Sequence, residues 1–211
     1  YVYTAMQSFL SWFRAVLSLA FFFAAADSTA QQGTLMESIS IEQGLSQGMI
    51  FDLLQDREGF LWVATKDGLN RYDGYNFKVF TNDPYNPFSL SSNTVVTLFE
   101  DSKGRIWAGT ENAGLNVYDK KSGRFHRIQH RSDDPASLSG NQINCIQEGG
   151  GDQIIVGALD QDLNVLTVPG DFFEKNTPPQ IRRVALPDNS FATGLARGGK
   201  GQIWVSSPKN I

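Results

Sequence analysis

Carboxylates that recur at a fixed spacing are the side chains of this sequence best suited to chemistry. Asp56 recurs 45 positions later as Asp101, and Asp73 recurs 46 positions later as Asp119. A glycosidase needs two carboxylates across one sugar bond, and Ca²⁺ needs several converging oxygens. Residues that occur once per repeat lie around a ring and do not converge. We therefore interpret Asp56 and Asp101 as bonding the backbone of their own turns, and we expect no catalytic residue, metal site or cofactor in this segment.

A tryptophan recurs as well, at Trp62, Trp107 and Trp204. Such rings suit a binding site, but a large ring at a fixed place in each repeat is better explained by packing between neighbouring repeats. Cys145 aligns with Thr97 in the middle of an apolar run and is expected to be a buried thiol. We assign these residues structural roles.

The elements that position these residues are copies of one repeat, which must be sought before other patterns. The positions of the first copy that recur in the second are Leu45, Asp56, Gly59, Trp62 and Thr65, matched by Leu90, Asp101, Gly104, Trp107 and Thr110. After one inserted residue, Gly68-Leu69-Asn70 and Tyr72-Asp73 recur as Gly114-Leu115-Asn116 and Tyr118-Asp119. This agreement at one offset indicates true repeats.

Two further copies are less complete. Ser137-Leu138-Ser139 begins a third copy, in which Ile155 replaces the tryptophan and Gly149–Asp152 replaces the Asp-x-x-Gly turn. We expect this copy to be irregular. Gly201-Gln202-Ile203-Trp204 matches Gly104-Arg105-Ile106-Trp107 and belongs to a fourth copy, and Trp204 lies seven residues before Ile211.

Each copy divides into four short runs rich in β-branched and aromatic residues, which in the second copy are 95–100, 105–110, 115–119 and 124–129. Glycine ends the turns between them, as tight hairpins require. Four strands in 45 to 48 residues are typical of a β-propeller blade. We predict an all-β fold, a β-propeller of four-stranded blades with about three and a half blades present, preceded by a signal peptide.

The predicted segments follow from the repeat. They are a signal peptide at 1–30, a lead-in at 31–43, blade 1 at 44–88, blade 2 at 89–136, a degenerate blade 3 at 137–186 and a truncated start of blade 4 at 187–211. A closed propeller has typically 4 to 8 blades. We therefore expect the sequence, which starts with Tyr1, to be part of a longer chain.

Residues 1–30 have the pattern of an export signal. Arg14 precedes an apolar run, 15–26, which is short for a bilayer span of about 20 residues. Small residues then lead to Ala30, after which we place cleavage. A retained membrane anchor and a buried amphipathic helix are the alternatives.

Composition excludes several classes of protein. The 211 residues carry 18 Lys plus Arg against 22 Asp plus Glu, a net charge of −4. The sequence contains no stripe of Lys and Arg residues, which a nucleic-acid-binding protein would need. A single Cys excludes an internal disulfide framework and a Cys-rich zinc site.

The pattern Leu-Ser-x-Asn, Asp-x-x-Gly-x-Ile-Trp-x-Gly-Thr and Gly-Leu-Asn-x-Tyr-Asp resembles the two-component regulator propeller repeat. The linkers 83–91 and 134–139 agree with it, and the resemblance covers roughly 42 to 211. That family forms the periplasmic sensor region of hybrid histidine kinases common in Bacteroidetes. The resemblance implies further blades, a membrane helix and a kinase in the same polypeptide, acting as a homodimer in a phosphorelay.

The resemblance also implies location and ligand. The chain is expected to be exported, on the periplasmic face of the inner membrane, and to detect an extracellular small molecule or oligosaccharide. His126 and His130 lie at the end of blade 2, outside any helical phosphoacceptor context, so we expect no phosphate transfer by this segment.

Candidate ligand-binding residues lie in loops between the second and third strands and in one inter-blade stretch, which we place on the same face. They are Lys66, Asp67, Tyr85, Glu111, Asn112, Asp160 and Asp162. Plain solvated turns are the alternative for each of them. A secreted or surface scaffold without a kinase, and less so a carbohydrate-active enzyme, remain the alternative functions.

Overall fold

The computed structural model describes residues 38–175 and 177–208. The chain divides into two units, Tyr1–Ser38 and Ile39–Ile211, and the fold below is that of the second. The predicted signal peptide at 1–30 lies outside the described residues.

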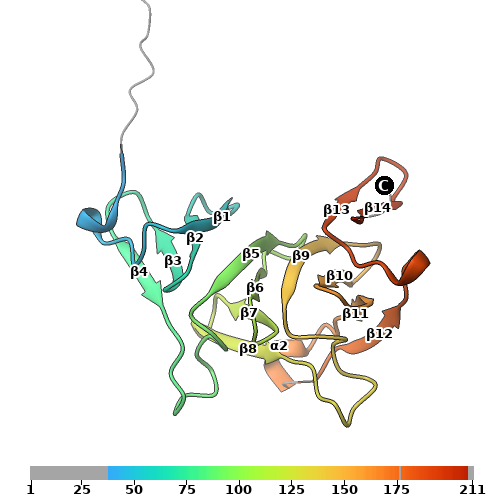
Figure 1. Ribbon diagram of the computed structural model, residues 1–211. Coiled ribbons are helices and arrows are strands. Elements are labelled where there is room, and N and C mark those ends of the chain that lie inside the picture. Colours follow the sequence, from blue (N-terminus) through green and yellow to red (C-terminus); the bar gives the residue numbers. More distant parts are fainter. Residues whose placement is uncertain (1–37, 176, 209–211) are drawn as a thin grey trace, which may run out of the picture. The chain divides into compact units, whose positions relative to one another are not determined.

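Three antiparallel sheets of four strands follow one another along the chain (Figure 1). The first contains β1 (Ile50–Gln55), β2 (Leu61–Thr65), β3 (Gly68–Tyr72) and β4 (Phe77–Phe80); the second β5 (Val95–Glu100), β6 (Ile106–Thr110), β7 (Leu115–Asp119) and β8 (Arg124–Ile128); the third β9 (Ile143–Glu148), β10 (Gln153–Ala158), β11 (Leu163–Thr167) and β12 (Gln180–Val184). A hairpin of β13 (Gly194–Arg197) and β14 (Ile203–Ser206) follows. Short helices are η1 (Ile41–Gln43), α2 (Phe172–Lys175) and η2 (Pro187–Asn189).

Each sheet is a meander in which consecutive strands pair, because the turns between them are short. Gly59 and Gly104 end the first turn of their sheets with φ angles of 91° and 76°, which residues that carry a Cβ rarely adopt. The degenerate third copy also forms a complete four-stranded sheet, so its lost Trp and turn motif did not prevent the blade. Its irregularity lies in the connection from β11 to β12, which contains α2.

The first strands of successive sheets lie side by side. β1 contacts β5, β5 contacts β9, and β9 contacts β13. Thr97 pairs with Gly109 in the second sheet, and Cys145 pairs with Gly157 in the third, so these residues occupy equivalent positions. The predicted all-β propeller of four-stranded blades, incomplete in this chain, is confirmed.

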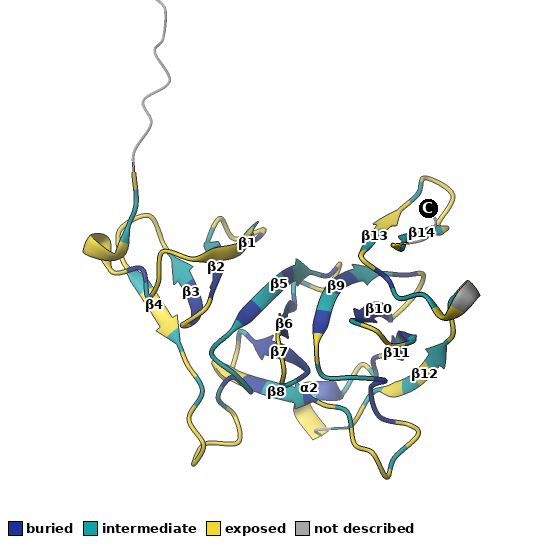
Figure 2. Ribbon diagram, viewed as in Figure 1, coloured by how far each residue is buried: buried dark blue, intermediate teal, exposed yellow. Residues whose placement is uncertain are grey.

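The core lies between sheets. Trp62 is completely buried, and its ring packs edge-on against Tyr118 of the second sheet at 5.3 Å between centroids. Trp107, also completely buried, belongs to the cluster that joins the second and third sheets. Figure 2 shows buried residues along β6 and β10, whereas β1 and β13 contain only exposed and partly exposed residues.

Trp204 is different, with 60% of its surface exposed. It lies on β14, and the described residues supply no further sheet after that strand. Its exposure follows from position, because each buried tryptophan is covered by the sheet that comes next in the chain.

Candidate functional site

Asp56 organises the turn between β1 and β2. Its Oδ1 accepts hydrogen bonds from the backbone N–H groups of Glu58 and Phe60, both at 3.0 Å. Its Oδ2 accepts the indole N–H of Trp62 at 2.9 Å, and the Lys120 ammonium lies 3.3 Å from the same oxygen. The carboxylate therefore holds its own turn, orients the tryptophan and links two sheets.

Asp101 repeats this arrangement in the second sheet. Its Oδ1 accepts the backbone N–H groups of Lys103 and Arg105, both at 3.0 Å. Its Oδ2 accepts the indole N–H of Trp107 at 2.8 Å and the Arg105 Nε–H at 2.5 Å. These carboxylates are already fully bonded, so their chemistry is structural.

The charges of this interface shift two pKa values. Burial raises the pKa of Asp56, but hydrogen bonds from Trp62 and Lys120 outweigh it, so the pKa lies below its ordinary value. Burial lowers the pKa of Lys120, but hydrogen bonds to Glu58 and Asp56 outweigh it, so that pKa is raised. Both groups are therefore held in their charged forms.

A buried asparagine in each sheet was not assigned a role from the sequence. Asn116 Oδ1 accepts the Ser91 N–H at 2.9 Å, and its Nδ2 donates to Ser91 Oγ at 2.8 Å and to the Ala108 carbonyl at 3.4 Å. Asn70 bonds Ser46, and Asn164 bonds Ser139, in the same way. The Leu-Ser and Gly-Leu-Asn motifs recur together because they bond each other.

Arginines on the fourth strands were also missed. Arg127 donates from Nε to the Ser89 carbonyl at 2.9 Å, and Arg183 from Nε to the Ser137 carbonyl at 3.1 Å. Both arginines occupy the fourth position of their strand, which is the signal that could have revealed them. They fix the linkers that enter the second and third sheets.

The predicted loops of neighbouring sheets lie at a common rim. Thr94 joins two of them, because its Oγ1 donates to the Lys66 carbonyl at 3.3 Å and its carbonyl accepts the Glu111 N–H at 3.1 Å. Ser139 Oγ donates to the Asp162 carbonyl at 2.7 Å in the third sheet. Asp160 has a φ of 56° and closes that turn. Asn112, like Glu111, is exposed.

Tyr85 and Asp67 complete the predicted set. Tyr85 is 96% exposed, and its linker runs along β8, where the Phe125 N–H donates to the Phe88 carbonyl at 2.8 Å. Asp67 accepts a long hydrogen bond from Asn93 Nδ2 at 3.5 Å. The structure thus brings the turns of Lys66 and Glu111 together through Thr94, and Tyr85 sits apart on the linker beside β8.

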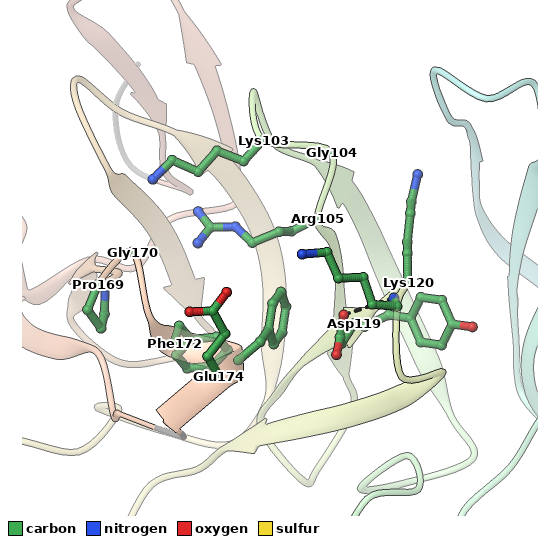
Figure 3. Close-up of a pocket in the computed structure, with 12 residues that line it drawn as sticks. Lys103, Gly104, Arg105, Asp119, Lys120, Pro169, Gly170, Phe172 and Glu174 are labelled. Atoms are coloured by element: carbon green, nitrogen blue, oxygen red, sulfur yellow. Dashed lines mark hydrogen bonds between the residues drawn. The ribbon is translucent and has the colours of Figure 1, made fainter.

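A pocket of about 400 Å³ lies at the opposite ends of the strands, and Figure 3 shows its lining. β6 has Arg105 before its first residue and Glu111 after its last, so the pocket and the predicted loops occupy opposite rims. Residues from the second and third sheets line it, among them Lys103, Arg105, Tyr118, Lys121, Phe172 and Glu174. Sequence reasoning selected none of these residues.

Other potentially reactive side chains have packing roles. Cys145 is buried, and burial raises the pKa of its thiol to about 11. His126 packs against Phe172 and Phe173, with ring centroids 5.3 Å and 5.1 Å apart. His130 Nδ1 is 2.6 Å from the Leu138 carbonyl.

Two further findings concern only the residues that the structure describes. Across 38–175 and 177–208, no group of three His, Cys, Asp or Glu side chains is placed to hold a metal ion. None of the helices in these ranges is long and apolar enough to cross a bilayer.

Comparison with known proteins agrees with this fold. The family described as two component regulator propeller matches residues 44–67 and 89–112. Histidine kinase P4 of Formosa agariphila is 40% identical over 74 residues, which are 35% of this chain and 5% of that protein.

Two solved structures from B. thetaiotaomicron are also similar. The extracellular domain of one hybrid two-component system has a TM-score of 0.68 and 26% identity, over 80% of this chain and 23% of that chain. The extracellular domain of a second has a TM-score of 0.64 and 18% identity, over 82% of this chain and 24% of that chain, a likeness of fold. The chain therefore spans less than a quarter of each relative. Residues 44–67 and 89–112 thus carry two-component regulator propeller repeats, and the blades of the chain resemble those of the extracellular domain of a hybrid two-component system.

Proposed function

We propose that this chain is a segment of the ligand-sensing ectodomain of a hybrid sensor histidine kinase. The observation that carries the proposal is the match of 80% of the chain, at 26% identity, to the extracellular domain of a hybrid two-component system. The 74-residue similarity to a histidine kinase supports it. The complete polypeptide then senses on the periplasmic side of the inner membrane.

The proposed ligand is a small extracellular molecule, in the first place an oligosaccharide released from a glycan. Binding changes kinase activity only if the ligand has different affinities for two arrangements of the ectodomains in a dimer. Hydrogen bonds between neighbouring blades allow the ectodomain to move as a rigid body. Arg57 of the first sheet donates to the carbonyls of Asp101 and Ser102 in the second, at 2.5 Å and 2.7 Å.

The test is phosphorylation of the complete polypeptide in membrane vesicles. Labelled ATP is supplied with and without neutral and acidic oligosaccharides, and the constituent monosaccharides serve as matched controls. We expect at least one oligosaccharide to change the rate of phosphate incorporation. Absence of any incorporation contradicts the kinase and favours a secreted scaffold. Incorporation that no saccharide changes contradicts glycan sensing.

A further inference from the structure

One connection departs from the repeat and builds a wall of the pocket. The third and fourth strands are joined by residues 73–76 in the first sheet and 120–123 in the second, but by residues 168–179 in the third. The longer connection contains α2. A feature present in one blade only can form a single converging site, which positions repeated around a ring cannot.

The α2 segment is held in place by packing. Phe172 is only 4% exposed and belongs to the cluster between the second and third sheets. Its backbone N–H donates to the Pro169 carbonyl at 3.2 Å, and the Lys175 N–H donates to the Asp171 carbonyl at 3.0 Å. His126 contacts the rings of Phe172 and Phe173 from the second sheet. The wall is therefore preformed rather than a loop that must fold around a ligand.

The facing wall carries cationic side chains, and one of them, Arg105, is held in a fixed orientation. Arg105 donates from Nε to Asp101, and its guanidinium carbon lies 5.4 Å from the centre of the Trp107 ring. Among the described residues, neither the terminal nitrogens of Arg105 nor the Lys121 ammonium has a hydrogen-bonding partner. Figure 3 shows the Arg105 side chain directed into the pocket. These donors are available to a bound anion.

Two other lysines at the pocket are already paired. Lys103 lies 2.5 Å from Asp152, and Lys120 lies within 4 Å of Asp56, Glu58 and Glu100. Arg105 is also paired with Asp101, but only through its Nε, so recognition falls to its two terminal nitrogens and to Lys121.

Apolar rings and two carboxylates complete the lining. One of them, Asp119, accepts hydrogen bonds from the Lys121 N–H and the Ser122 hydroxyl. Phe173, which is partly exposed, supplies ring surface on which the C–H face of a sugar can pack, and the buried Phe172 and Tyr118 support the floor of the pocket. Figure 3 shows the Glu174 carboxylate on the α2 side, facing Arg105 across the pocket. Glu174 can accept hydrogen bonds from hydroxyl groups, but it repels an anion. The volume of the pocket, about 400 Å³, falls within the range of small-ligand sites.

We propose that this pocket binds an oligosaccharide that carries an anionic group, a uronate carboxylate or a sulfate ester. Arg105 and Lys121 bind the anion, the Phe173 ring contacts the sugar, and Glu174 weakens the binding. The inference rests on the proposed function and names the ligand class of its sensor.

The test is calorimetry on the complete ectodomain with three probes: trigalacturonate, a sulfated galactose trisaccharide and neutral galactotriose. We expect one or both anionic probes to bind in preference to the neutral one, more weakly as salt is added. The anionic probe that binds distinguishes carboxylate from sulfate. Equal binding of the neutral probe, or no binding of either anion, overturns the inference.

Two exposed positions give opposite predictions. Lys121→Gln should weaken binding of the anionic probe by about threefold to fivefold, and Glu174→Gln should strengthen it by a similar factor, as expected for exposed charge pairs. The matched control is Lys200→Gln, on an exposed turn of the β13–β14 hairpin, which should leave affinity unchanged. Equal effects of all three variants contradict a local site.

This outcome is separable from that of the proposed function. Calorimetry requires no kinase, so binding can be found in a protein that fails the phosphorylation test. Conversely, a pocket that binds no anion leaves the phosphorylation result standing.

Discussion

At the scale of single residues, the asparagine–serine pairs explain why distant motifs recur together. Asn116 is completely buried and bonds both the N–H and the hydroxyl of Ser91, which precedes it by 25 positions. Its carboxamide thus ties the linker entering a sheet to the third strand of that sheet. An apolar replacement leaves those polar groups buried without partners.

We predict that Asn116→Ala lowers the free energy of unfolding by about 2–4 kcal/mol, because several buried hydrogen bonds are lost at once. Urea unfolding of the complete ectodomain measures it. Asn76→Ala, at an exposed turn, is the control and should change stability by less than about 0.5 kcal/mol. Equal effects of the two variants would show that the pairs do not hold the blades.

A second residue-scale prediction concerns pH and the Asp56–Lys120 pair between sheets. The folded pKa of Asp56 is lowered, so its contribution is complete above the unfolded pKa of about 3.9 and is lost as pH falls through the folded value. The folded pKa of Lys120 is raised, so its contribution is complete below about 10.4 and is lost as pH rises through the folded value.

The contribution of this pair should therefore be constant between these limits and be lost at both ends. The buried Cys145 thiol, whose pKa is raised to about 11, adds a separate loss of stability as pH rises above its unfolded pKa of about 8.5. In Asp56→Asn the acid fall should be smaller, because the group that must be protonated is missing. Unfolding measured from pH 3 to 11 checks this. An unchanged acid limb in the variant contradicts a role for the ion pair.

Sequence reasoning predicted part of this chemistry. The Asp-x-x-Gly pattern indicates a carboxylate that bonds the N–H groups two and four residues later, and Asp56 and Asp101 do so. The second role, accepting the indole N–H of the tryptophan six residues later, was missed. This second hydrogen bond depends on which face of β2 or β6 the tryptophan side chain lies on, and the spacing of the residues alone does not show that.

At the scale of elements, close approach of neighbouring blades depends on a glycine. A Cβ at Gly109 of β6 would lie 2.6 Å from Thr97 Cγ2 on the adjacent strand and 2.7 Å from Ile143 Cγ2 of the next sheet. Ile143 is completely buried and cannot move away freely. The absence of a side chain thus sets how closely β9 approaches β6.

We predict that Gly109→Ala destabilises the fold by about 1–3 kcal/mol through overpacking between blades. Urea unfolding of the complete ectodomain provides the measurement. The control is Gly48→Ala, where an added Cβ meets no atom within 4 Å. A neutral or stabilising Gly109→Ala would mean that the sheets can separate without cost.

The strands were predictable and the pocket was not. Predicted runs 105–110 and 124–129 differ from β6 and β8 by one residue at one end each. The pocket depends on residues 168–179, which lie outside the repeated positions, so aligning the copies hid them. Counting the residues between the last two strands of each copy would have exposed the insertion. The loops chosen instead lie at the opposite rim, and their role in binding stays a prediction.

At the scale of the whole molecule, apolar surface remains uncovered on the first and last strands. Leu53 of β1 is 56% exposed, whereas Leu98, the equivalent residue of β5, is 8% exposed and packed against the first sheet. Trp204 of β14 is 60% exposed. Unpaired apolar sheet surface of this kind promotes association.

We predict that residues 31–211, expressed alone, are aggregation-prone. Replacing Leu53 and Trp204 by lysine should reduce association, as measured by light scattering and sedimentation. Tyr75→Lys, at a turn residue that is 88% exposed, is the matched control and should have no effect. A sharp, reversible and monomeric unfolding transition of the unmodified segment would contradict the prediction.

The most direct test of the central claim, that these blades are part of a transmembrane sensor, is to read the gene in frame past codon 211. We predict further repeats of 45 to 48 residues, one apolar span of about 20 residues and then a kinase core. A stop codon after enough blades to close the ring, with no apolar span, would contradict the sensor and leave a secreted propeller.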